Sequence, residues 1–107
     1  MNSDITLTCN MDVFTAAQRD LHIQCTTQLI QQVQGIQEVE NGYEFSFPNE
    51  TEMLSKIAEF ISNERLCCTF LKFTLNVNPT GEPISLLLTG PTGTQEFLRA
   101  EFSGAFQ

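Results

Sequence analysis

The chain has 107 residues, 41% of them hydrophobic, which is enough for residues 1–107 to form a single domain around one core. Its formal net charge of −8 argues against binding to nucleic acid or to anionic membrane surfaces, because such a charge repels phosphate groups. No apolar run approaches the ~18 residues of a membrane span. Residues 1–4 lack the character of a signal peptide, so we expect a cytoplasmic protein.

The N-terminal third predicts an extended arm followed by a helix. Residues 5–9 alternate in the manner of a short strand or arm. Thr15 and Gln18 then form a capping-box pattern, and apolar residues recur every four positions, so we expect a helix over 16–33. The apolar stripe of this helix is predicted to contain Ala17, Leu21, Cys25, Leu29 and Val33.

A β-hairpin is the strongest local prediction in the sequence. Residues 36–40 and 43–47 alternate between apolar and polar side chains, and they flank the dipeptide Asn41-Gly42. Asn-Gly favours a two-residue turn in which both positions have a positive φ. Pro48 is expected to end the second strand.

The next part of the chain predicts another helix followed by two strands. A polar cap within residues 49–52 and apolar residues at spacings of three and four predict a helix that ends near Arg65. Residues 70–77 alternate like a strand, with Leu71, Phe73, Leu75 and Val77 on one face. A turn at 78–83 then leads into a strand over 84–89.

A last helix is expected after the turn at residues 90–93, with a capping box formed by Thr92 and Gln95. Its inward side chains are predicted to be Phe97, Leu98 and Phe102, and residues 103–107 are predicted to form a tail. The resulting order is α-β-β-α-β-β-α. This order predicts an α+β fold of two layers, in which helices cover one face of a four-stranded antiparallel sheet.

The chemistry of the chain is expected to centre on its four cysteines, Cys9, Cys25, Cys67 and Cys68. In a reducing compartment we expect them as thiols, and the adjacent Cys67 and Cys68 would bond to each other only in a strained geometry. Both follow the predicted end of a helix, where the partial negative charge disfavours a thiolate nucleophile. A soft metal deprotonates the sulfurs itself, so metal binding fits these residues better than catalysis.

The candidate metal ligands are Cys67 and Cys68, with Cys9 as the expected third sulfur and His22 as a further donor. The spacing C-x₂₋₄-C of structural zinc sites does not occur in the sequence. Soft ions such as Hg(II), Cu(I) or As(III) accept two or three sulfurs, and Hg, Zn or Cu are the expected metals.

Each of these residues also has a purely structural interpretation. Buried cysteine often acts as a small apolar side chain, and for Cys25, on the apolar stripe, we prefer that interpretation. Glu64 and Arg65, beside the cysteines, are interpreted as a solvated pair. We identify no catalytic residues, because one histidine and scattered hydroxyls suggest no catalytic arrangement.

The segment Glu64-Arg65-Leu66-Cys67-Cys68-Thr69-Phe70-Leu71-Lys72-Phe73 resembles a family of small bacterial proteins marked by the pattern E-x-x-C-C-P-F-x-x-F. The closing segment over residues 86–98 is similar to the same family, as are the surroundings of Cys9 and His22. Similar segments occur as tails on regulators of the mercury-resistance type. The resemblance implies a heavy-metal context with Cys67, Cys68 and Cys9 as ligands, although Thr69 stands where the family has proline.

We therefore expect a binding protein for a soft heavy metal or metalloid, which buffers or presents the ion without catalysing a reaction. One alternative is an interaction or dimerisation module without metal, in which Phe102 and Phe106 dock across a homodimer. The other alternative is a thiol redox protein, in which one cysteine acts as the attacking thiol and another as the resolving thiol.

Overall fold

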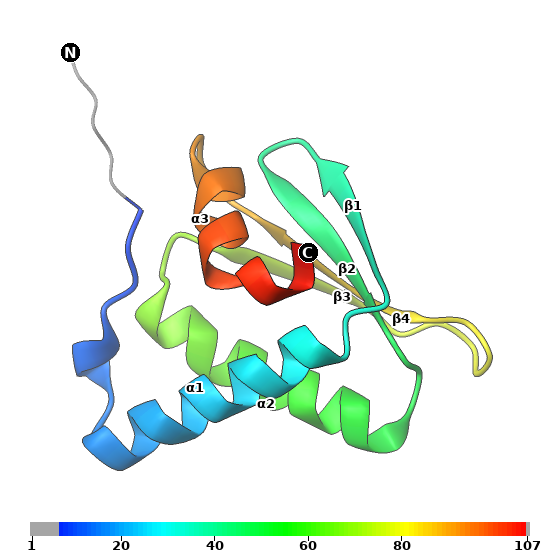
Figure 1. The fold of residues 1–107 in the computed structure, drawn as a ribbon, viewed down its shortest axis with the longest axis horizontal. Coiled ribbons are helices and arrows are strands. Elements are labelled where there is room, and N and C mark those ends of the chain that lie inside the picture. The colour runs from blue at the N-terminus through cyan, green and yellow to red at the C-terminus, as the bar shows by residue number, and fades with distance from the viewer. Residues whose placement is uncertain (1–6, 107) are drawn as a thin grey trace.

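The elements of the fold follow the predicted order in a computed structural model, which describes residues 7–106. They are η1 (Met11–Val13), α1 (Ala16–Gln31), β1 (Gly35–Val39), β2 (Gly42–Phe47), α2 (Thr51–Cys67), β3 (Lys72–Asn76), β4 (Ile84–Thr89), α3 (Thr94–Glu101) and η2 (Ser103–Phe106) (Figure 1). The predicted α+β class and the order α-β-β-α-β-β-α are thus confirmed. The predicted arm at 5–9 lies partly outside the described residues, and residues 7–10 form no regular element. No helix in the described part of the chain is long and apolar enough to cross a bilayer.

The four strands form one antiparallel sheet in the order β1-β2-β4-β3. Alternate side chains of a strand point to opposite faces of the sheet, and Phe45 of β2 lies opposite Leu86 of β4. The face that carries this pair is buried, with Tyr43, Phe45, Phe47, Ile84, Leu86 and Leu88. The residues between them, such as Glu44 and Ser85, are partly exposed on the other face. The helices therefore cover one face, as predicted.

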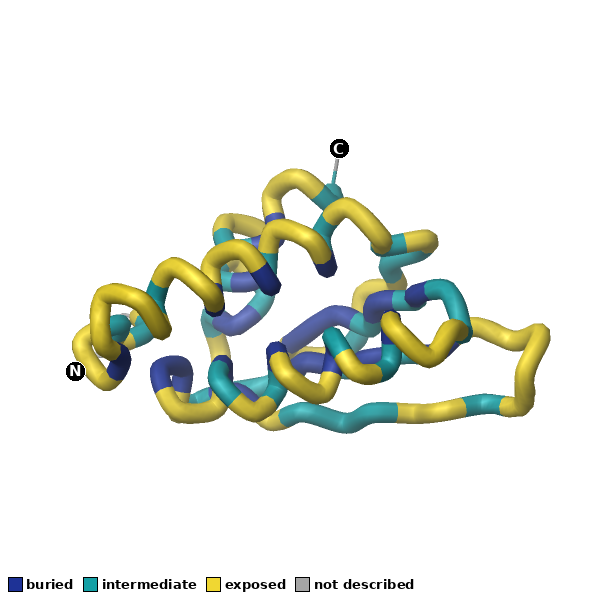
Figure 2. Tube along the Cα trace, turned by 90° about the horizontal axis from the view of Figure 1, so that it is seen from below, coloured by how far each residue is buried: buried dark blue, intermediate teal, exposed yellow. Residues whose placement is uncertain are grey.

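Aromatic side chains join the helical layer to the sheet. Phe60 of α2 meets Phe73 of β3 edge-on at 6.5 Å between ring centroids, and it also contacts Phe102 at 5.8 Å. Phe102 in turn stacks on Phe45 at 4.9 Å. The buried residues line the inward sides of these elements (Figure 2). Each such phenylalanine stabilises the fold by roughly 1.5–3 kcal/mol through burial alone.

The inward face of α1 differs from the predicted stripe. The capping box of Thr15 and Gln18 is present, but Leu21 is 60% exposed. The buried residues of α1 are His22, Cys25 and Leu29, which are spaced by three and four. The prediction that Leu21 faces inward was wrong because α2 offers a buried carboxylate to this face of α1, and His22 can bond it whereas leucine cannot.

The predicted hairpin is present, but its turn lies one residue earlier than expected. Val39 pairs with Gly42, so the turn residues are Glu40 and Asn41, and of these two Asn41 has a positive φ, of 57°. Gly42 belongs to β2 and pairs with Thr89 of β4. A Cβ atom at Gly42 would overlap the carbonyl oxygen of Leu88, so glycine is needed there for the close approach of two strands.

The caps of the two later helices also differ from the predictions. α2 starts at Thr51 with Glu50 as its N-cap, and the Glu50 side chain makes no capping hydrogen bond. The Asn49 amide donates instead to carbonyls of the β3–β4 turn. The predicted capping box of Thr92 and Gln95 is wrong, since Gly93 is the N-cap with φ 101°. Gln95 instead donates to the carbonyls of Val39 and Gly42, at 2.8 and 3.4 Å, which ties α3 to the hairpin.

The end of α2 and the start of β3 were also placed differently. α2 continues two residues past the predicted end at Arg65, so Cys67 is its last residue and Cys68 its C-cap. β3 covers only Lys72–Asn76, and Val77 is 54% exposed instead of sharing the inward face. The longer helix places Cys67 in the last turn of α2, on the side that faces α1 and the N-terminal segment.

Candidate metal and thiol site

Three of the four cysteines meet at the C-terminal end of α2. Cys67 and Cys68 come from the helix end, and Cys9 comes from the N-terminal segment. The backbone N–H of Asn10 donates to the carbonyl of Cys67 at 2.8 Å, which satisfies a carbonyl that a helix end leaves without a partner. This bond holds Cys9 in place, and the Sγ atoms of the three cysteines lie within 4.8 Å of one another.

The oxidation state differs from the expected set of free thiols. Cys9 and Cys68 form a disulfide, with their Cα atoms 4.4 Å apart. Cys67 remains a free thiol, and its Sγ lies 3.5 Å from the Sγ of Cys68. The adjacent Cys67 and Cys68 are not bonded to each other, as expected from the strain of such a bond. The expectation of free thiols was wrong for Cys9 and Cys68 because the fold places these distant residues side by side.

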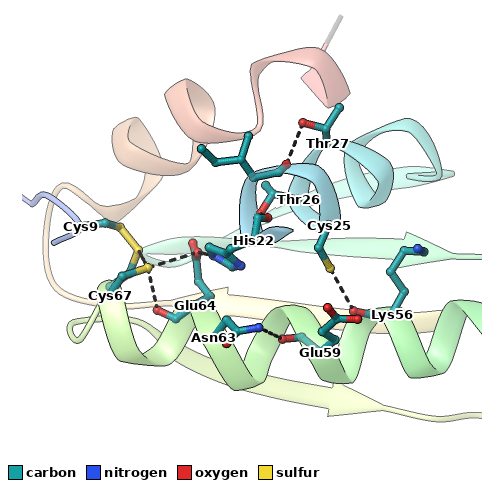
Figure 3. A network of polar contacts seen from close by, with 12 residues as sticks. Cys9, His22, Cys25, Thr26, Thr27, Lys56, Glu59, Asn63, Glu64 and Cys67 are labelled. Atoms are coloured by element: carbon teal, nitrogen blue, oxygen red, sulfur yellow. Dashed lines mark hydrogen bonds and ion pairs between the residues drawn. A yellow bond between two sulfur atoms is a disulfide. The ribbon is translucent and has the colours of Figure 1, made fainter. Parts of the chain in front are cut away.

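His22 and Glu64 form a buried pair directly behind the sulfurs. The Nε2 of His22 lies 2.7 Å from the Oε1 of Glu64, and the two residues are 4% and 1% exposed (Figure 3). Phe14 and Phe60 flank the imidazole, with ring centroids at 5.5 and 5.8 Å. The Sγ of Cys67 lies 3.8 Å from the same carboxylate oxygen. The interpretation of Glu64 as part of a solvated pair with Arg65 was therefore wrong.

Glu101, at the end of α3, adds a second carboxyl group to the site. Its side chain is hydrogen-bonded to Glu64. Donor atoms of Cys9, Glu64, Cys68 and Glu101 lie within 4.8 Å of one another. Three elements that are far apart in the sequence therefore deliver their polar groups to one place.

Burial controls the protonation of this site. It raises the pKa of Cys67 to about 12, and the nearby carboxyl groups of Glu64 and Glu101 act in the same direction. Burial and the hydrogen bond with Glu64 raise the pKa of Glu101 to about 10. Burial also raises the pKa of Glu64 and lowers the pKa of His22. At neutral pH Cys67 is consequently a thiol and a weak nucleophile, while Glu101 stays protonated and donates a hydrogen bond to Glu64.

A surface pocket reaches the polar side of the site. Its volume is about 220 Å³, and it is lined by Met11, His22, Ile23, Thr26, Thr27, Ile30, Glu64 and Glu101. Most of the lining comes from α1, with the carboxyl groups of α2 and α3 opposite. The imidazole and the two carboxyl groups can therefore be approached from solvent.

The remaining cysteine is separate from this site. Cys25 is 5% exposed, and its thiol donates to the carbonyl of Lys56 at 3.6 Å. It packs between α1 and α2, which agrees with the structural interpretation preferred for it. Among the residues proposed from the sequence, the structure brings together Cys9, Cys67 and Cys68, and it joins His22 to them through Glu64 and Cys67.

Glu64 and Glu101 were not identified as site residues from the sequence, although a signal was present. The buried positions of α2 are spaced by four, three, four and three, and this series contains Met53, Ile57, Phe60, Glu64 and Cys67. In α3 the same spacing runs from Thr94 and Leu98 to Glu101. A carboxylate on an otherwise apolar stripe indicates a buried polar partner.

Comparison of the chain with protein-family profiles, with curated proteins and with solved structures found no match.

Proposed function

We propose that the protein binds a soft heavy-metal or metalloid ion through the thiolates of Cys9, Cys67 and Cys68, without catalysing a reaction. The observation that carries this proposal is the meeting of the three Sγ atoms within 4.8 Å of one another. Two sulfurs that bind one tetrahedral ion at ~2.3 Å lie about 3.8 Å apart. The separation of 3.5 Å between the Sγ atoms of Cys67 and Cys68 is close to that spacing.

Ion binding requires the reduced protein. Two electrons and two protons convert the Cys9–Cys68 disulfide into two thiols, and we propose a cytoplasmic location, where the thiol pool supplies that reduction. The ion then displaces the thiol protons, because only the thiolate is a metal ligand. Since the pKa of Cys67 is raised to about 12, binding releases its proton at any physiological pH and strengthens as the pH rises.

Two further features of the chain agree with this proposal. The net charge of −8 attracts cations to the surface of the protein. The resemblance of residues 64–73 to the E-x-x-C-C-P-F-x-x-F family also indicates a heavy-metal context, and we propose membership of that family.

Hg(II) titration of the reduced protein, followed by native mass spectrometry, tests the proposal. We expect one tightly bound ion for the wild type and for Cys25→Ser, whose thiol lies outside the site. We expect loss of that ion in the double variant Cys67→Ser with Cys68→Ser. Unchanged Hg(II) uptake by the double variant would rule the proposal out.

A thiol redox function is the second candidate, and the neighbourhood of Cys67 favours it. Its thiol lies 3.5 Å from one sulfur of a disulfide, so attack on Cys68 would release the Cys9 thiolate. The pKa of about 12 for Cys67 and the strain of a Cys67–Cys68 bond both oppose this step. Rapid alkylation of Cys67 in the disulfide-intact protein near neutral pH would favour the redox function, and slow alkylation would favour metal binding.

The alternative of a dimerisation module is not supported at Phe102. Phe102 is fully buried in the core, so the expectation that it docks across a dimer was wrong. Phe106 packs against Tyr43 of its own chain, with 4.9 Å between ring centroids. Homodimer formation stays a prediction that light scattering can test.

A further inference from the structure

A second group of buried donors overlaps the three sulfurs only at Cys67. Donor atoms of His22, Glu64 and Cys67 lie within 4.8 Å of one another, and all three residues are buried. The Cys9–Cys68 disulfide involves none of them. We propose that the disulfide-bonded protein binds a divalent ion of the zinc type through His22, Glu64 and Cys67. This site differs from the soft-ion site in its ligands, and it does not require reduction of the disulfide.

The observed spacings are close to those of a tetrahedral zinc site. With Zn–S ~2.3 Å and Zn–O ~2.1 Å, a bound sulfur and oxygen lie about 3.6 Å apart. The Sγ of Cys67 and the Oε1 of Glu64 are 3.8 Å apart. The corresponding N···O spacing is about 3.4 Å. The Nε2 of His22 and the Oε1 of Glu64 are 2.7 Å apart, so the ion replaces their hydrogen bond after a small outward movement.

One atom of this group lacks a hydrogen-bond partner within the part of the chain that the structure describes. It is the Nδ1 of His22, and it is buried. Buried polar atoms nearly always have partners, so this atom indicates that a further molecule occupies the site. Water in the adjacent pocket supplies a partner to Nδ1 while Nε2 holds the ion.

The charges of the donors match a divalent ion. A thiolate at Cys67, a carboxylate at Glu64 and a neutral imidazole at His22 together carry two negative charges, which a divalent cation neutralises. Neutrality matters because Phe14 and Phe60 make the surroundings of the imidazole apolar. The mixture of nitrogen, oxygen and sulfur suits zinc, whereas softer ions prefer the sulfurs that become available on reduction.

The pocket of about 220 Å³ gives the ion an entry path. His22, Glu64 and Glu101 line it, so a ligand position facing the pocket remains open to water. Glu101 is hydrogen-bonded to Glu64 and orients its carboxylate, in the way that neighbouring groups position metal ligands.

The test uses the disulfide-intact protein with Co(II) as a spectroscopic probe and Zn(II) as the competing ion. The chain contains one histidine, so its ¹⁵N imidazole signals report on His22 without any substitution. We expect one bound ion, a thiolate-to-Co(II) charge-transfer band that Zn(II) abolishes, and a shift of the Nε2 signal on Zn(II) addition. Absence of both the band and the shift would overturn the proposal.

Variants separate this site from non-specific binding. Cys67→Ser should lose the charge-transfer band, and Glu64→Gln should weaken Co(II) binding at least tenfold. Cys25→Ser and Glu59→Gln, which replace a buried thiol and an exposed carboxylate outside the group, should bind as the wild type does. A charge-transfer band that survives in Cys67→Ser would contradict the assignment. Circular dichroism checks that each variant is folded. If a variant does not fold, the shift of the His22 imidazole signal in the wild-type protein tests the proposal without it.

This outcome is independent of the soft-ion proposal. Failure of the disulfide-intact protein to bind Co(II) and Zn(II) leaves Hg(II) binding by the reduced protein untouched. Failure of the reduced protein to bind Hg(II) leaves the mixed-donor site untouched. Zn(II) binding by the disulfide-intact protein that is lost in Cys67→Ser supports the ligand set, because the disulfide occupies the other two sulfurs.

Discussion

The substitution Glu64→Ala tests the buried pair at the centre of the site. Glu64 is 1% exposed and is the partner of the Nε2 of His22 at 2.7 Å. Its removal leaves an imidazole that is 4% exposed without a partner at either nitrogen within the described chain, because Nδ1 already has none. An orphaned buried polar group costs about 1–3 kcal/mol. The cavity left by the side chain adds to that cost, so we expect the free energy of unfolding to fall by about 3 kcal/mol. This value is the low end for a broken buried pair, because burial lowers the pKa of His22 and the orphaned imidazole is neutral.

Urea unfolding followed by circular dichroism measures this loss, which corresponds to a fall in Tm of roughly 12 °C for a chain of this size. The exposed Glu59 lies on the same helix, and Glu59→Ala should change stability by less than about 0.5 kcal/mol. The double variant His22→Leu with Glu64→Met should be more stable than Glu64→Ala, because it leaves no orphaned imidazole and a smaller cavity. A Glu64→Ala variant as stable as the wild type, or a double variant less stable than Glu64→Ala, would refute the reasoning.

Three other predictions follow from the same structure. Cys9→Ser removes the disulfide to Cys68, which closes a loop of 59 positions, so under oxidising conditions chemical denaturation should show a stability lower by about 4 kcal/mol. Under reducing conditions the variant should be as stable as the wild type. Gly42→Ala should lower stability by about 1–3 kcal/mol in the same assay, because its Cβ would lie 2.9 Å from the Thr89 Cα. Gly35→Ala should cause no such loss, because the nearest atom to its Cβ is 3.8 Å away. The folded-state pKa of Glu101, about 10, exceeds its ordinary value of 4.5, so the stability this carboxyl contributes is complete below pH 4.5 and is lost as the pH rises toward 10. Denaturation of the metal-free protein should show stability falling from pH 5 to pH 9, and Glu101→Gln should make that fall shallower; an equally steep fall in the variant would count against the assignment.

The order of helices and strands followed from local patterns in the sequence. Alternation of apolar and polar residues predicted the strands, and apolar spacings of three and four predicted the helices, because each pattern places the apolar side chains on one buried face of the element. The predicted capping box of Thr15 and Gln18 is also confirmed, because both of its hydrogen bonds join residues three positions apart. The capping box at Thr92 and Gln95 failed because the Gln95 amide bonds the hairpin, which is distant in the sequence.

The candidate site was predictable only in part. Adjacent cysteines after a helix indicated the position of the site, and the proposed third sulfur, Cys9, does lie beside Cys67 and Cys68. Nothing in the local sequence indicates that Asn10 bonds the end of α2, which is the contact that brings Cys9 there. The disulfide is likewise a consequence of tertiary structure.

The polar half of the site was missed for a related reason. Leu21 was chosen as an inward residue because it belongs to a series of apolar residues that recur every four positions. That choice reverses once Glu64 is buried on the facing helix, since the pair satisfies both residues. The spacing in α2 indicates a buried carboxylate at Glu64, but its pairing with His22 depends on how the two helices face each other, which requires the fold.

X-ray absorption spectroscopy of the reduced protein loaded with one equivalent of Hg(II) tests the central claim most directly, because it counts the sulfur atoms bound to the ion. The convergence of Cys9, Cys67 and Cys68 predicts three sulfur ligands around one mercury, and two in the Cys9→Ser variant. A wild-type spectrum with two sulfurs that Cys9→Ser leaves unchanged, or one dominated by nitrogen and oxygen, would contradict it.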